Sequence, residues 1–182
     1  PNFVSIPTNG IKLRAVVEGT GPLMVMVHGF PESWYSWRHQ IAPLAAAGFQ
    51  VCAIDVRGYG ASDKPGEVAD YSLEQITADV AGVIEHLSPN EKAVLIGHDW
   101  GAPIVWNTAL TRPDRVRAVA GLSVPYTGVP AVQFMEGIKA AFTDRGRVFF
   151  QVYFQDVGPA EAELGSDPRA AVLVPLVQTA TT

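Results

Sequence analysis

Residues Ala93 to Pro103, with the sequence AVLIGHDWGAP, contain the most informative local pattern of this chain. Its first four residues, 93–96, are apolar and predict a short buried strand. The segment GHDWG (97–101) follows, and residues 102–110 predict a helix whose first turn tolerates Pro103. The stretch therefore predicts a strand, a sharp turn flanked by glycines, and a helix.

Asp99 stands at the tip of this predicted turn. A strand, turn and helix of this kind form a nucleophile elbow, in which glycines make room for a residue with a strained backbone. The usual elbow has a serine at its tip, whereas a carboxylate there attacks carbon and forms an ester. A helix cap is the alternative role for an aspartate, but it does not account for the glycines on both sides. We therefore predict that Asp99 is a nucleophile, kept ionised by the helix N-terminus and nearby N–H groups.

A second motif, HGFP at residues 28–31, follows the apolar run at residues 23–27. In the architecture that carries a nucleophile elbow, two backbone N–H groups stabilise the negative charge that develops on oxygen. One comes from the residue after the nucleophile, here Trp100, and the other from the loop after an earlier strand, here Phe30. An ordinary tight turn is the alternative interpretation of HGFP.

The histidines beside these motifs are weak candidates for a general base. His98 precedes Asp99 on the strand, so its side chain is expected on the opposite face. His28 is expected to brace the loop. In the later motif D-x-RGYG, Asp55 and Arg57 are expected to form a structural turn and an ion pair.

The chain before residue 123 alternates strands and helices. Asn9-Gly10 predicts a two-residue hairpin turn, and Ser72 with Gln75 predicts a capping box that begins a helix. The predicted elements are a hairpin of strands 3–7 and 11–17, further strands at 23–27, 51–54, 93–96 and 116–122, and helices at 37–47, 72–87 and 102–110. This alternation predicts an α/β fold with a mainly parallel sheet and helices on both faces.

Beyond Ser123 the pattern changes, and no clear strand is predicted. Helices are expected at 130–142, 147–156 and 168–178. We interpret this segment as the beginning of a helical lid, because no linker-like composition separates it as a domain. The expected organisation is residues 1–123 as the N-terminal part of the core and residues 124–182 as a truncated lid. The lid aromatics suit an internal core as well as an apolar substrate pocket.

Composition narrows the class of protein. The 182 residues are 48% hydrophobic and 17% charged, which suits one soluble globular domain. The net charge of −5 argues against a nucleic-acid-binding surface.

No apolar run approaches the ~20 residues of a membrane helix, and the first ten residues lack an export-signal pattern, so we expect a cytoplasmic protein. The single Cys52 excludes an internal disulfide, and the spacing of the four histidines predicts no metal site.

Several segments together resemble the epoxide hydrolases of the α/β-hydrolase superfamily, most closely the bacterial, actinobacterial-type members. They occur in order over nearly the whole chain: HGFPESWYSWRHQI (28–41), D-x-RGYG-x-S (55–62), GHDWGAP (97–103), R-x-RAVAGLSVP (115–125) and YFQ-x-x-G (153–158). The resemblance implies the α/β-hydrolase fold with a lid, and a reaction that needs no cofactor. Asp99 would open a small apolar epoxide to an enzyme ester, and a histidine paired with an acid would activate the water that releases a vicinal diol. The resemblance also implies that lid tyrosines bind the epoxide oxygen, in a pocket that we assign to His28, Pro31, Phe150 and Tyr153.

Two features depart from the family's pattern. Family members continue through the rest of the lid, two more strands, and the segments with the catalytic histidine and its acid, whereas this sequence ends within the lid. We therefore expect part of a longer protein, capable alone of a single turnover at most, whose partner is its C-terminal remainder or a second copy. The family's first oxygen-binding tyrosine also falls at Phe150, which has no hydroxyl, and Tyr153 one helical turn later is a candidate substitute.

Two other functions stay open. Haloalkane dehalogenases share an aspartate elbow followed by tryptophan, but they usually have asparagine or glutamate where Phe30 stands. A non-catalytic relative that binds an apolar ligand would account for Phe150 and for the missing segments. A serine esterase is disfavoured because the sequence has no G-x-S-x-G motif.

Overall fold

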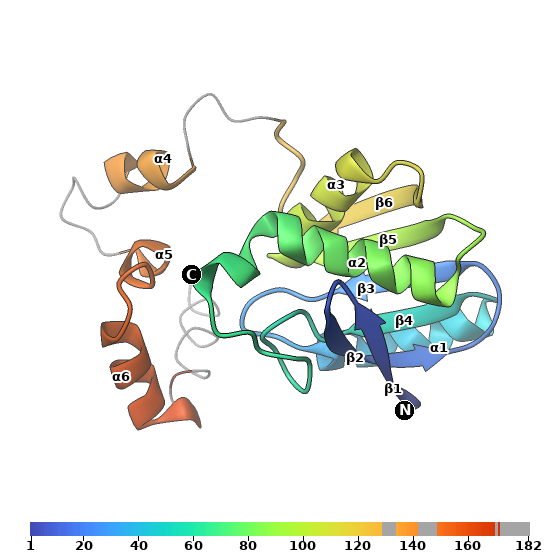
Figure 1. Ribbon diagram of the computed structural model, residues 1–182, viewed down its shortest axis with the longest axis horizontal. Helices are drawn as coiled ribbons and strands as arrows, with labels where there is room; N and C mark the ends of the chain where they lie inside the picture. Colours follow the sequence, from blue (N-terminus) through green and yellow to red (C-terminus); the bar gives the residue numbers. More distant parts are fainter. Residues whose placement is uncertain (129–133, 142–148, 170, 172–182) are drawn as a thin grey trace. The chain divides into compact units, whose positions relative to one another are not determined.

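The computed structural model describes residues 1–128, 134–141, 149–169 and 171. The chain divides into two compact units, Pro1–Tyr126 and Thr127–Thr182 (Figure 1). The assignment of residues 1–123 to a catalytic core and of residues 124–182 to a lid stays a prediction.

The first unit is built on a six-stranded sheet in the order β1-β2-β4-β3-β5-β6. The strands are β1 (Phe3–Thr8), β2 (Ile11–Glu18), β3 (Leu23–Val27), β4 (Gln50–Ile54), β5 (Ala93–His98) and β6 (Val116–Leu122). The pairs β1–β2 and β2–β4 are antiparallel, and the pairs among β3, β4, β5 and β6 are parallel. Asn9 and Gly10 form the hairpin turn with positive φ angles of 43° and 77°. The predicted hairpin and the mainly parallel sheet are confirmed.

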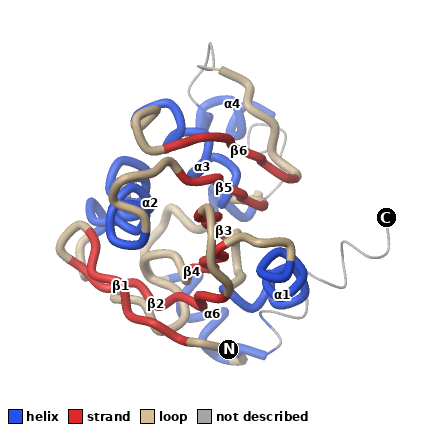
Figure 2. Tube along the Cα trace, turned by 90° about the vertical axis from the view of Figure 1, so that its right-hand side faces the viewer, coloured by secondary structure: helices blue, strands red, loops and turns tan. Residues whose placement is uncertain are grey.

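Helices cover both faces of the sheet. α1 (Arg38–Ala46) packs on β4 and β2, whereas α2 (Leu73–Leu87) packs on β1 and β3, and α3 (Gly101–Thr111) packs on β5 and β6. Figure 2 shows α1 and α2 on opposite sides of the strands. Two short 3-10 helices, η1 (Trp34–Trp37) and η2 (Val68–Tyr71), precede α1 and α2. None of the described helices is long and apolar enough to cross a membrane.

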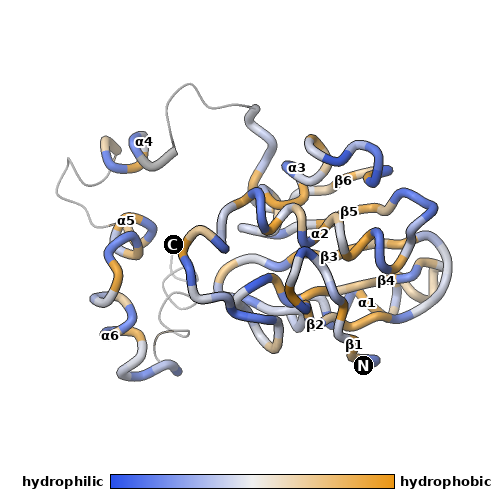
Figure 3. Tube along the Cα trace, in the orientation of Figure 1, coloured by the Kyte–Doolittle hydropathy of each residue, from blue (hydrophilic) through white to orange (hydrophobic). Residues whose placement is uncertain are grey.

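The core of the first unit lies on both sides of β3. All five residues of this strand, LMVMV, are buried, as its continuous apolar run predicts. Val25 packs with α2 and α3 residues such as Val80 and Val105, whereas Met26 packs with Trp37 and Ile41 on the other face. Figure 3 shows the hydrophobic residues concentrated along the inner strands. The sheet therefore separates two apolar layers. The carboxyl ends of its parallel strands, β3, β4, β5 and β6, lie at the same end of the sheet.

The predicted ion pair between Asp55 and Arg57 is wrong in its partners. Arg14 on β2 donates its Nε to Asp55 Oδ2 at 2.6 Å. Arg57 instead forms a bidentate pair with Asp79 on α2, at 2.7 Å from Nε and 2.6 Å from Nη2. The Arg57 and Asp79 side chains are 3% and 1% exposed. A buried charge needs a close partner. Asp55 and Arg57 therefore do not pair with each other: Asp55 binds Arg14 on the neighbouring strand, and Arg57 binds Asp79 on the helix that packs on the sheet.

The start of α2 forms half of the predicted capping box. Ser72 accepts a hydrogen bond from the Gln75 backbone N–H at 3.3 Å, as expected of an N-cap residue. The side chain of Gln75 accepts from Asn9 Nδ2 at 2.8 Å. The polar side chain at the third helical position thus ties the hairpin turn to the helix.

The second unit contains α4 (Phe134–Ala141), α5 (Phe150–Tyr153) and α6 (Pro159–Ser166). α4 lies within the predicted helix 130–142, and α5 is shorter than the predicted helix 147–156; parts of both predictions lie outside the described residues. The predicted helix 168–178 falls mostly outside them too. Sequence reasoning missed α6, although Pro159 at its first position and Glu161, which accepts from the Gly158 N–H at 2.7 Å, are helix-start signals.

Candidate active site

Asp99 lies in a sharp turn between β5 and α3. Its φ of 51° is in the left-handed region, which a non-glycine residue adopts only when its surroundings hold it there. A Cβ at Gly97 would lie 2.1 Å from Gly101 O, and one at Gly101 would lie 2.1 Å from Val27 O. The predicted reason for both glycines, crowding of the neighbouring backbones, is confirmed.

The Asp99 carboxylate reaches the HGFP loop. Its Oδ1 accepts the backbone N–H of Phe30 at 2.9 Å. The loop backbone comes so close that a Cβ at Gly29 would lie 2.5 Å from Asp99 Oδ1. Within the described part of the chain, Oδ2 has no hydrogen-bond partner, and the N-cap residue of α3 is Trp100, without a side-chain cap. The carboxylate therefore does not act as the helix cap that was the alternative to a nucleophile.

Glu32 holds the same loop from the other side, and sequence reasoning gave it no role. Its Oε2 accepts the Gly29 N–H at 3.0 Å, and its Oε1 lies 3.3 Å from His98 Nδ1. Glu32 thus links the residue before Phe30 to the residue before Asp99. The signal available in the sequence was its place directly after HGFP, within one turn of the loop it supports.

His28 is enclosed beneath the loop. Its side chain is 1% exposed, its Nδ1 lies 2.8 Å from Gly29 O, and its Nε2 accepts the Val56 N–H at 3.0 Å. Burial lowers the pKa of His28, which keeps the ring neutral. These contacts agree with a bracing role that joins the ends of β3 and β4. The assignment of His28 to the substrate pocket stays a prediction.

Tyr59 is a further residue of this site that sequence reasoning passed over. Its ring meets the His28 ring edge to face, with centroids 5.0 Å apart. Burial, and then the negative charge of Asp99, raises the pKa of Tyr59 and keeps its phenol protonated. The sequence placed Tyr59 only within the RGYG motif, and the long-range contact with His28 depends on β3 and β4 being neighbours.

The outer rim of the site is apolar. The Phe30 and Trp100 side chains are 38% and 44% exposed. Pro31 follows Phe30 through a cis peptide bond. The role of the Phe30 and Trp100 backbone N–H groups as oxyanion donors stays a prediction, as does the place of Pro31 in a substrate pocket. The structure brings Asp99, Phe30, Trp100 and His28 together within the first unit.

The other two predicted pocket residues belong to the second unit. Phe150 is 46% exposed and lies in a group of aromatic rings with Phe149 and Phe154. The Tyr153 hydroxyl donates to Glu163 Oε2 at 2.6 Å, and this hydrogen bond raises the pKa of Tyr153. A raised pKa makes the phenol a weaker proton donor, so Glu163 does not help Tyr153 to act as an acid.

No metal site is visible among the described residues, where His, Cys, Asp and Glu do not gather in groups of three or more that could hold an ion. The described groups of the site are the Asp99 and Glu32 carboxylates, backbone N–H groups and aromatic rings. The chemistry that such a set supports is attack by a carboxylate oxygen on an electrophilic carbon.

Residues 22–159 of the chain match the family model described as the alpha/beta hydrolase fold. The chain is 44% identical over 164 residues to epoxide hydrolase 3 of Siraitia grosvenorii, and 45% identical over 165 residues to epoxide hydrolase A of Mycobacterium tuberculosis. Each match covers 90% of this chain, but only 51% and 50% of the two relatives. The chain thus spans about half the length of the curated relatives it matches.

The solved structures agree with this likeness. The crystal structure of epoxide hydrolase A from Mycobacterium thermoresistibile matches with a TM-score of 0.88 and 47% identity, over 94% of this chain and 54% of that one. The order of the strands, the elbow at the end of β5 and the family match over most of the sequence lead to one conclusion. This chain belongs to the α/β-hydrolase fold family.

Proposed function

We propose that the protein containing this chain is an epoxide hydrolase in which Asp99 is the nucleophile. The observation that carries the proposal is the Asp99 carboxylate, strained at the elbow, with Oδ1 bound to the Phe30 N–H and Oδ2 without a hydrogen-bond partner among the described residues. The names of the relatives support the choice of an epoxide as substrate.

In the proposed first step, Asp99 Oδ2 attacks one carbon of the epoxide ring. The new carbon–oxygen bond forms as the ring carbon–oxygen bond breaks, and the released oxygen keeps the electron pair and takes up a proton from water. The product of this step is an ester between Asp99 and the substrate. Strain in the three-membered ring drives the step, so no cofactor is required.

In the second step, water adds to the ester carbonyl and releases a vicinal diol. The oxygen that becomes negative is Oδ1, which already accepts the Phe30 N–H at 2.9 Å; the Trp100 N–H is the proposed second donor. We assign the base that activates this water to the part of the relatives' length that this chain does not span. This chain alone is therefore expected to form the ester once and to hydrolyse it very slowly.

The substrate is proposed to be a small apolar epoxide. Phe30, Pro31 and Trp100 supply apolar surface beside Asp99 in the first unit, and Phe150 and Tyr153 are the proposed contribution of the second unit. Phe150 offers no proton, and the Tyr153 hydroxyl is already bound to Glu163. A single lid tyrosine, or none, thus takes part in the ring opening.

The test is mass spectrometry of the 182-residue chain after incubation with a small reactive epoxide. We expect the mass of one epoxide to be added, and peptide mapping to place it on Asp99. Asp99→Ala is the control and should gain nothing at this position. We expect Tyr153→Phe to form the adduct at the wild-type rate within about threefold, less than the loss of one hydrogen bond to the epoxide oxygen would cause, because the Tyr153 hydroxyl is already bound to Glu163. An unmodified Asp99 in the folded wild-type chain would overturn the proposal.

Haloalkane dehalogenation is the second candidate, and the observation that favours it is the exposed Trp100 side chain directly after Asp99. An indole N–H beside the nucleophile suits a departing halide. Incubation with a chloroalkane in place of the epoxide distinguishes the two, because only a dehalogenase would release chloride and alkylate Asp99. If neither reagent modifies Asp99, the remaining candidate is a relative that only binds an apolar ligand.

The proposed location is the cytoplasm, and the proposed partner is the C-terminal remainder of the same protein or a second copy of this chain. The half-length match to the relatives supports the proposal of a C-terminal remainder. Size-exclusion chromatography with light scattering measures the oligomeric state.

A further inference from the structure

The end of β6 supports the nucleophile elbow. β6 runs parallel beside β5, with Gly121 opposite Gly97 and Leu122 opposite His98. The next residue on the β5 side is Asp99, whose backbone N–H donates to Leu122 O at 3.2 Å. The orientation of Asp99 therefore depends on where the last residue of β6 is held.

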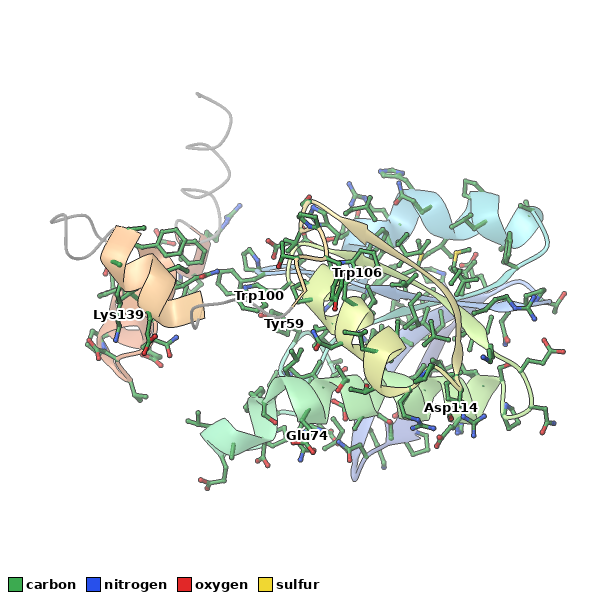
Figure 4. All side chains as sticks on the ribbon, turned by 90° about the horizontal axis from the view of Figure 1, so that it is seen from above. Tyr59, Glu74, Trp100, Trp106, Asp114 and Lys139 are labelled. Carbon is green, nitrogen blue, oxygen red and sulfur yellow. The ribbon has the colours of Figure 1, made fainter. Side chains whose placement is uncertain are left out.

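Trp106 on α3 holds that end of β6. Its indole N–H donates to Val124 O at 3.1 Å, two residues beyond the strand. The ring lies so close to Gly121 that a Cβ there would come within 2.6 Å of the indole Nε1. Tyr126, the last residue of the first unit, has its ring 6.0 Å from the Trp106 ring. Figure 4 shows Trp106 and Trp100 on the same part of the first unit.

Ser123 connects the two hydrogen bonds. Its φ of 71° is in the left-handed region, an unfavourable conformation for serine that the neighbouring contacts must maintain. On one side Leu122 O accepts the Asp99 N–H, and on the other Val124 O accepts the Trp106 indole N–H. If the second bond is lost, Ser123 can relax toward an ordinary conformation, and Leu122 O then moves away from the elbow.

We propose that Trp106 is a positioning residue for Asp99. Trp106 on α3 binds Val124 O just beyond the end of β6. This contact keeps Leu122 O within hydrogen-bond distance of the Asp99 amide. Asp99 is thereby held so that Oδ1 stays aligned with the Phe30 N–H. The consequence for catalysis rests on the proposed function, whereas the effect on the Asp99 backbone does not.

The test compares three variants of the 182-residue chain. Trp106→Phe keeps an aromatic ring and removes the indole N–H, and Gly121→Ala keeps the indole but displaces it. Trp37→Phe is the matched control, because the buried Trp37 Nε1 has no hydrogen-bond partner among the described residues. NMR measures hydrogen exchange at the Asp99 amide, with the amide of Leu95 in the middle of β5 as the internal reference. This ratio separates a local change at the elbow from a general loss of stability.

We expect Trp106→Phe and Gly121→Ala to raise the exchange rate of Asp99 relative to Leu95 by about fivefold, the scale of one hydrogen bond's net contribution, and Trp37→Phe to leave the ratio unchanged. The rate of epoxide addition to Asp99 should fall in the same two variants. An unchanged ratio in both variants would overturn the proposal. If the wild-type chain forms no adduct, the proposed function fails, but the exchange ratio still decides the role of Trp106.

Discussion

The two units of this chain hold their candidate site residues in different ways. In the first unit, Asp99 is held by a hydrogen bond from Phe30, by crowded glycines and by the ends of two parallel strands. In the second unit, the described helices have only eight, four and eight residues, and Phe150 is 46% exposed. Helices this short gain little stability on their own. The sheet therefore preorganises Asp99, the proposed nucleophile, whereas Phe150 lies on a short helix and is partly exposed.

The substitution with the greatest predicted effect on stability removes the buried ion pair of the first unit. Asp79→Ala leaves the Arg57 guanidinium, 3% exposed, without its carboxylate, and we expect a loss of about 3–5 kcal/mol in the free energy of unfolding. Urea denaturation followed by tryptophan fluorescence measures it, because all four tryptophans lie in the first unit. Glu163→Ala, which breaks the exposed Tyr153 contact of the second unit, is the matched variant and should leave the fluorescence transition in place. Equal effects of the two substitutions would contradict the distinction between the units.

A second pair of substitutions compares glycines. Gly97→Ala places a Cβ 2.1 Å from Gly101 O, a backbone atom that cannot move aside, so we expect a loss of about 2–3 kcal/mol and failure of adduct formation at Asp99. Gly137→Ala lies on α4, where a Cβ meets no described atom within 4 Å, and we expect a gain of about 0.5–1 kcal/mol in helix stability. Circular dichroism and fluorescence during urea denaturation report the two changes separately. A tolerated Gly97→Ala would show that the elbow is less crowded than the glycine contacts indicate.

The smallest expected effect is a dependence on pH. Burial lowers the pKa of His28 below its ordinary value of 6.5, so the unfolded chain binds more protons than the folded one in mildly acidic solution. The stability that comes from neutral His28 is therefore complete above pH 6.5 and is lost as the pH falls below this value. The free energy of unfolding of the first unit should therefore fall as the pH is lowered below 6.5. The second unit contains no histidine, so its stability should not depend on pH in this way.

Urea midpoints from tryptophan fluorescence, measured between about pH 5 and 8, test this dependence. His28→Gln is the control, because glutamine keeps a donor and an acceptor but does not titrate in this range. A variant with the same pH profile as the wild type would assign the dependence to another group.

Local patterns made much of the first unit predictable. The Asn-Gly turn, the continuous apolar run of β3 and the glycines around Asp99 each act over a few residues, and the structure has the elements they predict. The second unit was less predictable, because its elements are short and its signals weaker. α6 was missed although Pro159 and Glu161 mark its start.

The alternation of strands and helices, the elbow and the residue at its tip could be predicted from the sequence, because periodicity and turn chemistry depend on neighbours along the chain. Which polar groups meet could not be predicted, because it depends on how the strands and helices pack. Asp55 pairs with Arg14 and Arg57 with Asp79, and Glu32 reaches His98 across 66 positions. These partners are set by which strand lies beside which, and a buried charge or N–H group then binds the complementary group that the packing brings within reach.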